Sequence, residues 1–275
     1  MIVFPQAKIN LGLNVVRKRP DGYHDIQSVL VPIPLCDVLE AVVDPSLAPG
    51  EVRFTRSGIP VEGAITDDLC MKAIRAVEEV HALPGLRVHL HKAIPTGAGL
   101  GGGSSDAAQM LLLLDRALGL RTSKARLYEW AARAGSDCPF FLEPAPQLAE
   151  GRGERLTPIP LDLEGTWLML VNPGVHVSTA EVYRSTTPTG NTVDLPAALA
   201  RDRSRWQQTV VNVMEGPVAR MHPVVGAVKE RLLQAGAWYA AMSGSGSTVF
   251  GLFAQEPPSL GWPKDHVSWT FSLDH

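Results

Sequence analysis

A run of small residues spans Pro95–Ala108, where the chain reads PTGAGLGGGSSDAA and carries five glycines and two serines. Glycine lacks a Cβ atom, so its backbone can approach an anion closely and can adopt positive φ angles. The first amides of a following helix have no partner within that helix, and they favour a negative charge. A strand-like pattern at Leu86–His91 precedes the run and an apolar helical pattern at Ala107–Leu118 follows it. The run therefore predicts a phosphate-binding loop rather than a flexible linker.

Two familiar phosphate-binding motifs can be tested against this loop. The Walker A motif requires a Gly-Lys-[Ser/Thr] ending, but no glycine in the chain is followed by lysine, so a P-loop NTPase is excluded. The dinucleotide fingerprint G-x-G-x-x-G matches at Gly97, Gly99 and Gly102, but Pro95 separates the strand from the loop. No acidic residue follows a second strand about 20 positions later, because that region has a helical pattern. The loop favours nucleotide phosphates bound without a nicotinamide.

Composition limits the kind of protein this is. With 275 residues and 45% hydrophobic content, the chain can form one large or two modest domains, and we predict two, over residues 1–156 and 157–275. The net charge of −3 offers no extended basic surface for nucleic acid, so a small-molecule partner is expected. Cys36, Cys70 and Cys138 show no C-x-x-C spacing, which fits a reducing cytoplasm rather than a disulfide framework or a zinc site. Neither secretion nor membrane spanning is expected, because no apolar run approaches 18 residues and Met1–Gln6 lacks a basic segment with a long apolar stretch.

Alternating strands and helices are expected to position the loop and its partners. Period-2 alternation over Ala7–Val15 predicts a strand that directs Lys8 and Asn10 to the same face. A turn at Arg19–Gly22 then leads into a second strand over residues 26–33. The mixture predicts an α+β fold class. Further expected elements are strands near 38–43, 52–55, 86–91, 167–171, 238–242 and 248–253, and helices near 67–80, 107–118, 122–134, 196–199, 206–218 and 224–234.

Four segments resemble, in order, those of the GHMP kinases, the family named for galactokinase, homoserine kinase, mevalonate kinase and phosphomevalonate kinase. They are residues 5–24, the loop over Pro95–Ala108, Gly135–Phe141 and Met242–Phe250. The resemblance implies an N-terminal domain like the second domain of ribosomal protein S5 and a C-terminal ferredoxin-like domain. It also implies a kinase that uses ATP and Mg²⁺.

Within the family, the resemblance is to the branch whose acceptor is a cytidine diphosphate-linked methylerythritol, phosphorylated on its 2-hydroxyl in the non-mevalonate route to isoprenoids. One alternative is another GHMP kinase, for mevalonate, homoserine or a sugar, which the Asp21–His24 segment (DGYH) disfavours. The other is a non-catalytic nucleotide-binding regulator of the same fold, which the presence of both Lys8 and Asp137 disfavours. A monomer and a homodimer are both compatible with the sequence.

The resemblance implies which residues hold ATP. The loop and the first turn of the next helix would bind the phosphates, with the two serine hydroxyls near phosphate or Mg²⁺. Lys92 and Asp68 have structural alternatives, as an exposed lysine at a strand end and as a helix N-cap. The expected ATP-binding set is Pro95, Thr96, Gly97, Ala98, Gly99, Leu100, Gly101, Gly102, Gly103, Ser104, Ser105, Lys92, Asp68 and Leu69.

Asp137 and Lys8 are the expected catalytic residues. In the family, the aspartate of a Gly-[Ala/Ser]-Asp-x-Pro-Phe motif lies beside the acceptor hydroxyl, and residues 135–140 match that motif. An aspartate with a pKa near 3.9 is a weak base for an alcohol, but in a loose transition state the proton can leave late, so Asp137 would mainly orient the hydroxyl. Lys8 would favour the alkoxide and keep Asp137 ionised. From the residues alone, a helix N-cap and an exposed strand lysine remain the alternatives.

The same resemblance implies how the acceptor is held. Tyr23 would stack on the cytosine ring, His24 would hydrogen-bond its edge, Tyr183 would close the other side, and Asn10 would lie near the sugar alcohol. The Ser243–Ser247 turn lies in the last of the four segments, corresponds to what the family calls its third motif, and would face both substrates. A packed surface hairpin and a close-packed turn are the structural alternatives. The expected acceptor-binding set is Asn10, Tyr23, His24, Tyr183, Ser243 and Gly244.

Overall fold

The computed structural model describes residues 1–274, which form two compact units. Unit 1 comprises residues 1–7, 35–96 and 101–144, and unit 2 comprises the remainder. Because both units combine distant segments of the chain, they do not test the predicted boundary between residues 156 and 157, which stays a prediction. Strands and helices are mixed in both units, in agreement with the predicted α+β class.

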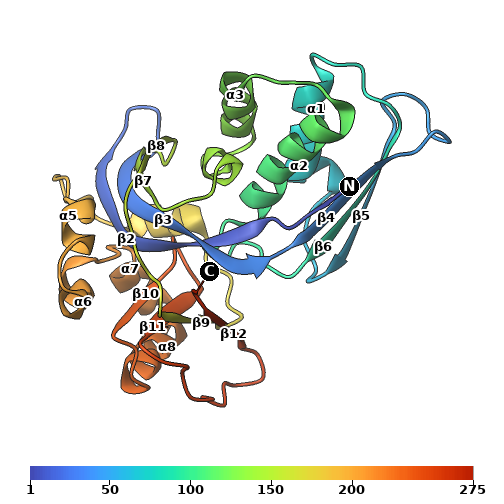
Figure 1. The fold of residues 1–275 in the computed structure, drawn as a ribbon. Helices are drawn as coiled ribbons and strands as arrows, with labels where there is room; N and C mark the ends of the chain where they lie inside the picture. Colours follow the sequence, from blue (N-terminus) through green and yellow to red (C-terminus); the bar gives the residue numbers. More distant parts are fainter. Residues whose placement is uncertain (275) are drawn as a thin grey trace. The chain divides into compact units, whose positions relative to one another are not determined.

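Unit 1 is a four-stranded sheet covered by helices (Figure 1). The strand order is β1 (Ile2–Val3), β4 (Val38–Val43), β6 (Leu86–Lys92) and β5 (Val52–Gly58), with β5 and β6 parallel and the other pairs antiparallel. The helices are α1 (Leu69–Glu78), α2 (Gly102–Leu118) and α3 (Lys124–Ala134), with short 3₁₀ turns η1 (Ile65–Asp67) and η2 (Cys138–Leu142). Helix α2 packs on β1 and β4 and also contacts α1, α3 and η2.

Helix ends in unit 1 follow capping rules, with one exception. Asp68 caps α1 through Cys70 N and Ser123 caps α3 through Arg126 N, each within one residue of the helix starts predicted near residues 67 and 122. Helix α2, however, begins at Gly102 rather than near residue 107, so our predicted start was wrong. The low helix propensity of glycine hid this first turn, which tertiary packing stabilises. Gly102, Gly103, Ser104 and Ser105 therefore form the start of the helix itself.

Unit 2 contains two further four-stranded sheets and five α-helices within the described residues. One sheet has the order β2 (Gln6–Lys18), β3 (His24–Cys36), β7 (Gln147–Gly151) and β8 (Arg155–Pro158). The other has the order β10 (Tyr239–Met242), β11 (Val249–Phe253), β9 (Trp167–Asn172) and β12 (Val267–Ser272). The helices are α4 (Thr179–Ser185), α5 (Leu195–Leu199), α6 (Trp206–Thr209), α7 (Glu215–Met221) and α8 (Pro223–Gln234), with the 3₁₀ turn η3 (Arg203–Arg205). Helix α8 packs on β10 and β11 over a shared apolar core.

One predicted helix of unit 2 is wrong. The pattern over residues 206–218 predicts a single helix, but the structure has α6 and α7 with a break between them. In the break, Val211 O accepts from Leu13 N at 3.0 Å and Val213 N donates to Leu13 O at 2.9 Å. The segment pairs with strand β2 instead of continuing the helix, and helical periodicity cannot reveal such a long-range pairing.

Candidate active site

The glycine loop has the backbone that phosphate binding requires. Gly97, Gly99 and Gly101 have φ angles of 66°, 79° and 71°, in the left-handed region that favours glycine. Gly101 is the N-cap of α2, and no side chain caps this helix end. The first amides of α2 therefore lack the side-chain acceptor that the Asp68 and Ser123 caps supply to α1 and α3.

These residues fit a triphosphate and its metal ion. The Ser105 hydroxyl is buried in the first turn of α2 and has no hydrogen-bond partner among residues 1–274, and the helix end favours an anion. Within residues 1–274, no group of three or more His, Cys, Asp or Glu side chains is arranged to hold a metal ion. An Mg²⁺ ion would therefore take most of its ligands from phosphate oxygens and water, as is common for this ion. The Ser104 and Ser105 hydroxyls, on the first turn of α2, are side-chain oxygens of the loop that could join them.

In unit 2, the loop residues 97–100 are hydrogen-bonded to the third motif, the segment around Ser243–Ser247 between β10 and β11. Ser243 Oγ donates to Gly99 O at 2.8 Å, and Thr248 N donates to Ala98 O at 3.2 Å. A Cβ atom at Gly99 would lie 1.9 Å from Ser243 O, so only glycine allows this approach. The structure brings together two motifs that lie about 140 residues apart in the sequence.

Sequence reasoning missed the residue that holds this turn in place. Asn212 Nδ2 donates to Met242 O and to Gly244 O, both at 2.8 Å, while its Oδ1 accepts from Met214 N at 3.0 Å. The side chain is 2% exposed. Nothing in the sequence near Asn212 distinguishes it, because its partners belong to a strand and a turn about 30 residues later.

Lys8 and Asn10 lie on the same face of β2, as predicted, and both are buried, contrary to the alternative of an exposed strand lysine. Lys8 Nζ donates to Asn10 Oδ1 at 2.5 Å, and Asn10 Nδ2 donates to Ser28 Oγ at 2.7 Å. Ser28 in turn donates to Gly12 O at 2.6 Å. Burying an ammonium group is costly unless it is hydrogen-bonded, so this chain of contacts holds Lys8 at a defined position. The Ser28 contribution was missed because it comes from the neighbouring strand.

Asp137 occupies the N-cap position of η2 in unit 1, but its side chain makes no capping hydrogen bond. This observation argues against the structural alternative of a helix cap. The next residue, Cys138, is buried, and its thiol contacts the Ser104 hydroxyl on the first turn of α2. Burial raises the pKa of the Cys138 thiol to about 12, so it stays protonated. The Asp137 motif therefore packs directly against the helix that follows the glycine loop.

Other predicted nucleotide residues are also in unit 1. Asp68 caps α1 and forms an ion pair with Arg56 at 3.4 Å, in line with its structural alternative. A Cβ atom at Gly103 would lie 3.7 Å from Leu69 Cδ1, so Leu69 faces the first turn of α2. Lys92 is 3% exposed and binds two buried carboxylates, contrary to the alternative of an exposed lysine.

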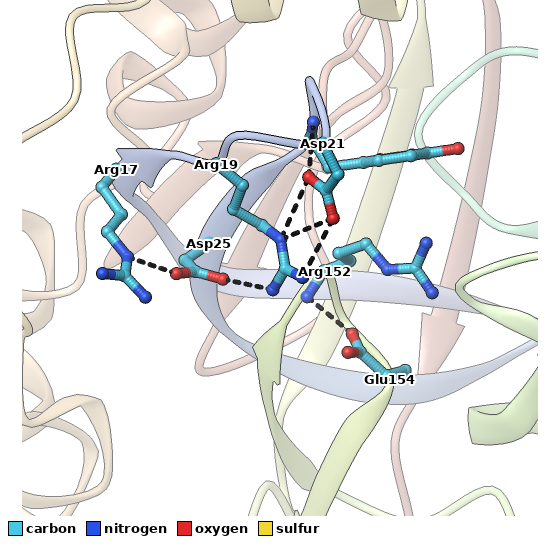
Figure 2. Close-up of polar contacts among 7 residues, drawn as sticks. Arg17, Arg19, Asp21, Asp25, Arg152 and Glu154 are labelled. Atoms are coloured by element: carbon cyan, nitrogen blue, oxygen red, sulfur yellow. Dashed lines mark hydrogen bonds and ion pairs between the residues drawn. The ribbon is translucent and has the colours of Figure 1, made fainter.

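In unit 2, a network of ion pairs links the residues of the turn between β2 and β3 (Figure 2). Arg17 and Arg19 both bind Asp25, at 2.6 and 3.0 Å, and Arg19 also binds Asp21. Hydrogen bonds from these arginines lower the pKa of Asp21 and Asp25. Asp21 also accepts from the backbone amide of Tyr23 at 3.1 Å, which fixes the residue that is expected to stack on a base.

The expected base-binding side chains do not form one stack. His24 stacks on Tyr183, with ring centroids 4.9 Å apart and planes inclined by 21°. Tyr23 is 54% exposed, and the guanidinium of Arg152, from the turn between β7 and β8, lies 4.9 Å from its ring centroid. Burial lowers the pKa of His24, and the charge of Lys18 lowers it further, so the imidazole is neutral near pH 7 and can both donate and accept.

Two family models match the chain. One, described as GHMP kinases N terminal domain, matches residues 68–143, and the other, described as GHMP kinases C terminal, matches residues 194–261. The 4-diphosphocytidyl-2-C-methyl-D-erythritol kinase of Parabacteroides distasonis is 47% identical over 253 residues, which is 92% of each chain. The chain belongs to the GHMP kinase family. The protein of the same name from Bacteroides thetaiotaomicron is 42% identical and covers 95% of this GHMP kinase and 96% of its own length.

Solved structures agree with this membership. The crystal structure of a 4-(cytidine 5′-diphospho)-2C-methyl-D-erythritol kinase matches with a TM-score of 0.78 and 35% identity, covering 92% of this chain and 90% of the other. A mevalonate kinase structure matches with a TM-score of 0.70 at 11% identity, which concerns the fold alone. The predicted two-domain GHMP kinase fold is thus confirmed, and membership in this kinase family implies that the chain uses ATP.

The predicted site residues of this GHMP kinase fall into two groups. Those in unit 1 are Asp68, Leu69, Lys92, Pro95, Thr96, Gly101, Gly102, Gly103, Ser104, Ser105 and Asp137. Those in unit 2 are Lys8, Asn10, Tyr23, His24, Gly97, Ala98, Gly99, Leu100, Tyr183, Ser243 and Gly244. Their individual roles stay predictions. None of the helices among residues 1–274 is long and apolar enough to cross a membrane.

Proposed function

We propose that this GHMP kinase transfers the γ-phosphoryl group of ATP to the 2-hydroxyl of 4-diphosphocytidyl-2-C-methyl-D-erythritol. This reaction belongs to the non-mevalonate route to isoprenoid precursors. The observation that carries the proposal is the 47% identity to a kinase of that name over 92% of both chains. The structural match at 35% identity supports the same acceptor.

The donor half of the proposal rests on the loop and on α2. The uncapped N-terminus of α2, with positive φ angles at alternate glycines before it, would hold the phosphates through backbone amides. Mg²⁺, when bound, would neutralise charge on the phosphate oxygens. Ser104 and Ser105 are the side chains that would hold the ion or a phosphate. The pattern of donors suits a polyphosphate better than a single carboxylate, because several amides and hydroxyls converge on the same segment.

The acceptor hydroxyl would be activated by Asp137 and Lys8. We propose that Asp137 orients the hydroxyl and takes its proton late, while the Lys8 ammonium stabilises the developing alkoxide. The contact of Lys8 with Asn10 gives its Nζ atom a fixed position, which favours such a role over that of a surface lysine.

A substrate panel tests the acceptor. The full-length protein with ATP and Mg²⁺ should release ADP with 4-diphosphocytidyl-2-C-methyl-D-erythritol and not with mevalonate, homoserine or galactose. ADP release is measured in a coupled assay, and the position of the new phosphate is read by phosphorus NMR. If the protein instead phosphorylates another acceptor of the panel, its function is that of a different GHMP kinase. ATP binding with no turnover of any acceptor would favour a nucleotide-binding regulator.

Replacing Tyr23 with alanine should weaken binding of the acceptor but not of ATP. Base stacking on an aromatic ring contributes about 1–3 kcal/mol, so the KM for the cytidyl acceptor should rise by roughly 5- to 150-fold. The KM for ATP should change by less than about 2-fold, and steady-state kinetics with each substrate varied in turn would show this. Tyr128→Ala, at a partly buried position on α3 of unit 1, is the matched aromatic control. Equal rises in both KM values would contradict the stacking role.

We also propose a cytoplasmic location for the protein. Cys70 and Cys138 are buried, and burial raises the pKa of both thiols, so neither is primed for oxidation. A reducing compartment suits such thiols, and it is where ATP and a nucleotide-linked acceptor are available together.

A further inference from the structure

Three charged side chains, Asp37, Lys92 and Asp106, meet in the interior of unit 1, where none is more than 3% exposed. Lys92 Nζ donates to Asp106 Oδ2 at 2.7 Å and also to Asp37 Oδ2. Asp37 lies between β3 and β4, Lys92 is the last residue of β6, and Asp106 lies near the start of α2. We call these three residues the buried triad. Neither aspartate belongs to the nucleotide-binding set expected from the sequence.

Asp37 fixes the chain where it leaves β6 toward the glycine loop. Its Oδ1 atom accepts from Ala93 N at 2.6 Å and from Ile94 N at 2.8 Å. Its own backbone amide donates to Pro5 O at 2.9 Å, so Asp37 is itself held in the sheet. One carboxylate therefore orients two successive amides just before the loop and, through its second oxygen, the Lys92 ammonium.

The far end of the loop is held against the same place. A Cβ atom at Gly102 would lie 2.8 Å from Ile94 Cγ2 and 3.3 Å from Lys92 Nζ, so the first turn of α2 rests directly on these residues. Lys92 then reaches Asp106 in the following turn. The residue before the loop and the residues after it are thus tied to each other through the buried triad.

The charges of the triad suit a position beneath an anion-binding helix end. Burial alone would lower the pKa of Lys92, but attraction to Asp106 and Asp37 outweighs it and raises that pKa. Burial raises the pKa of Asp106, although Lys92 opposes the shift. Lys92 therefore remains an ammonium beneath the N-terminus of α2, and its positive charge offsets the negative charge of its acidic partners there.

We infer that Asp37 is a positioning residue for the phosphate-binding loop, which it holds at both ends through Lys92 and Asp106. The inference rests on the proposed function and adds to it residues that would not touch the nucleotide. Removing one partner of a buried ion pair is destabilising, so the backbone amides and the ammonium that Asp37 holds are expected to move. A displacement of about 1 Å in a binding loop is enough to change rates and affinities by up to about 100-fold.

The test measures nucleotide affinity and steady-state kinetics of full-length variants. Asp37→Asn should raise the Kd and the KM for ATP by about 10-fold or more, because its amide group would face the Lys92 ammonium. The KM for the cytidyl acceptor should stay within about 2-fold. Lys92→Met should weaken ATP binding similarly, and the double variant should be no worse than either single variant, because both changes break one linkage. Kd values are measured by calorimetry with ATP and Mg²⁺.

A second pair of variants serves if Asp37→Asn does not fold. Asp106→Ala removes the helix side of the triad and should also weaken ATP binding, whereas Asp106→Asn keeps an acceptor for Lys92 and should bind ATP within about 2-fold of the original protein. Asp115→Asn is the matched control, since Asp115 accepts from Thr122 N at 2.7 Å near the other end of α2. It should leave ATP affinity unchanged.

The outcomes separate this inference from the proposed function. Folded Asp37→Asn or Asp106→Ala protein with the original Kd for ATP would overturn the positioning role, even with full kinase activity. Loss of melting temperature without a change in ATP affinity would do the same, because it would indicate a purely structural role. If the original protein binds ATP but phosphorylates none of the panel acceptors, the proposed function fails, while the effect of Asp37→Asn on ATP binding still decides the inference.

Discussion

The Asp137→Asn variant should bind ATP with a Kd within about 2-fold of the original protein, while kcat falls by about 100-fold or more. A positioned acid–base group contributes roughly 10²- to 10⁴-fold to proton transfer, and an amide can hydrogen-bond the acceptor but cannot take its proton. The substitution removes no capping hydrogen bond of η2, because the Asp137 side chain makes none. Calorimetry with ATP and a coupled ADP assay measure the two quantities separately.

Asp67→Asn is a suitable control for this variant, since Asp67 is exposed, lies in the same unit and is outside the expected site. It should leave both Kd and kcat unchanged. Near-normal turnover of Asp137→Asn would remove Asp137 from its catalytic role. A parallel fall in kcat and in melting temperature would instead assign Asp137 to the structure of the 135–139 segment. A rise in the KM for the acceptor with kcat unchanged would indicate that Asp137 binds the ground state as strongly as the transition state.

The parts of the fold that follow local rules could be predicted from the sequence. Asp68 and Ser123 cap helices where expected, and α2 ends at Gly119, whose φ of 61° explains the glycine. Strand β4 has the predicted bounds of Val38–Val43. Strands β7, β8 and β12 were not predicted, because they are short or lack a clear alternation of buried and exposed residues. Their pairing is decided by partners elsewhere in the chain.

The candidate site shows the same division between local and distant information. The glycine loop and the Lys8–Asn10 pair are visible in the sequence, since both depend on spacing within one segment. Asn212 and Asp37 are not, because the backbone groups that they hold lie about 30 and 56 residues away. Buried polar residues of this kind hydrogen-bond to backbone carbonyls or amides. Nearly every residue type carries these groups, so the sequence does not reveal which of them is the partner. Resemblance to a family supplied the expected roles, and the structure supplied the residues that support them.

The Gly99→Ala variant should lose both stability and ATP affinity. A side chain at a φ of 79° costs about 1–3 kcal/mol of backbone strain. The new Cβ atom would also lie 1.9 Å from the carbonyl oxygen of Ser243, and this clash can be relieved only if the backbone moves. The free energy of unfolding should fall by at least about 2 kcal/mol. The KM for ATP should rise, because the loop would lose its hydrogen bonds to the third motif.

Gly103→Ala separates this effect from the mere addition of a methyl group to the loop. A Cβ atom there would meet only Leu69 Cδ1, at 3.7 Å, an ordinary van der Waals distance. Alanine stabilises a helix by about 1 kcal/mol relative to glycine, so the melting temperature of Gly103→Ala should be equal to or above that of the original protein. Thermal unfolding of both variants, with and without ATP, makes the comparison. If Gly99→Ala and Gly103→Ala unfold at the same temperature, the close approach of Gly99 to Ser243 does not hold the loop. If Gly99→Ala alone is destabilised and ATP stabilises it less than the original protein, the glycine is required there because two backbones must touch.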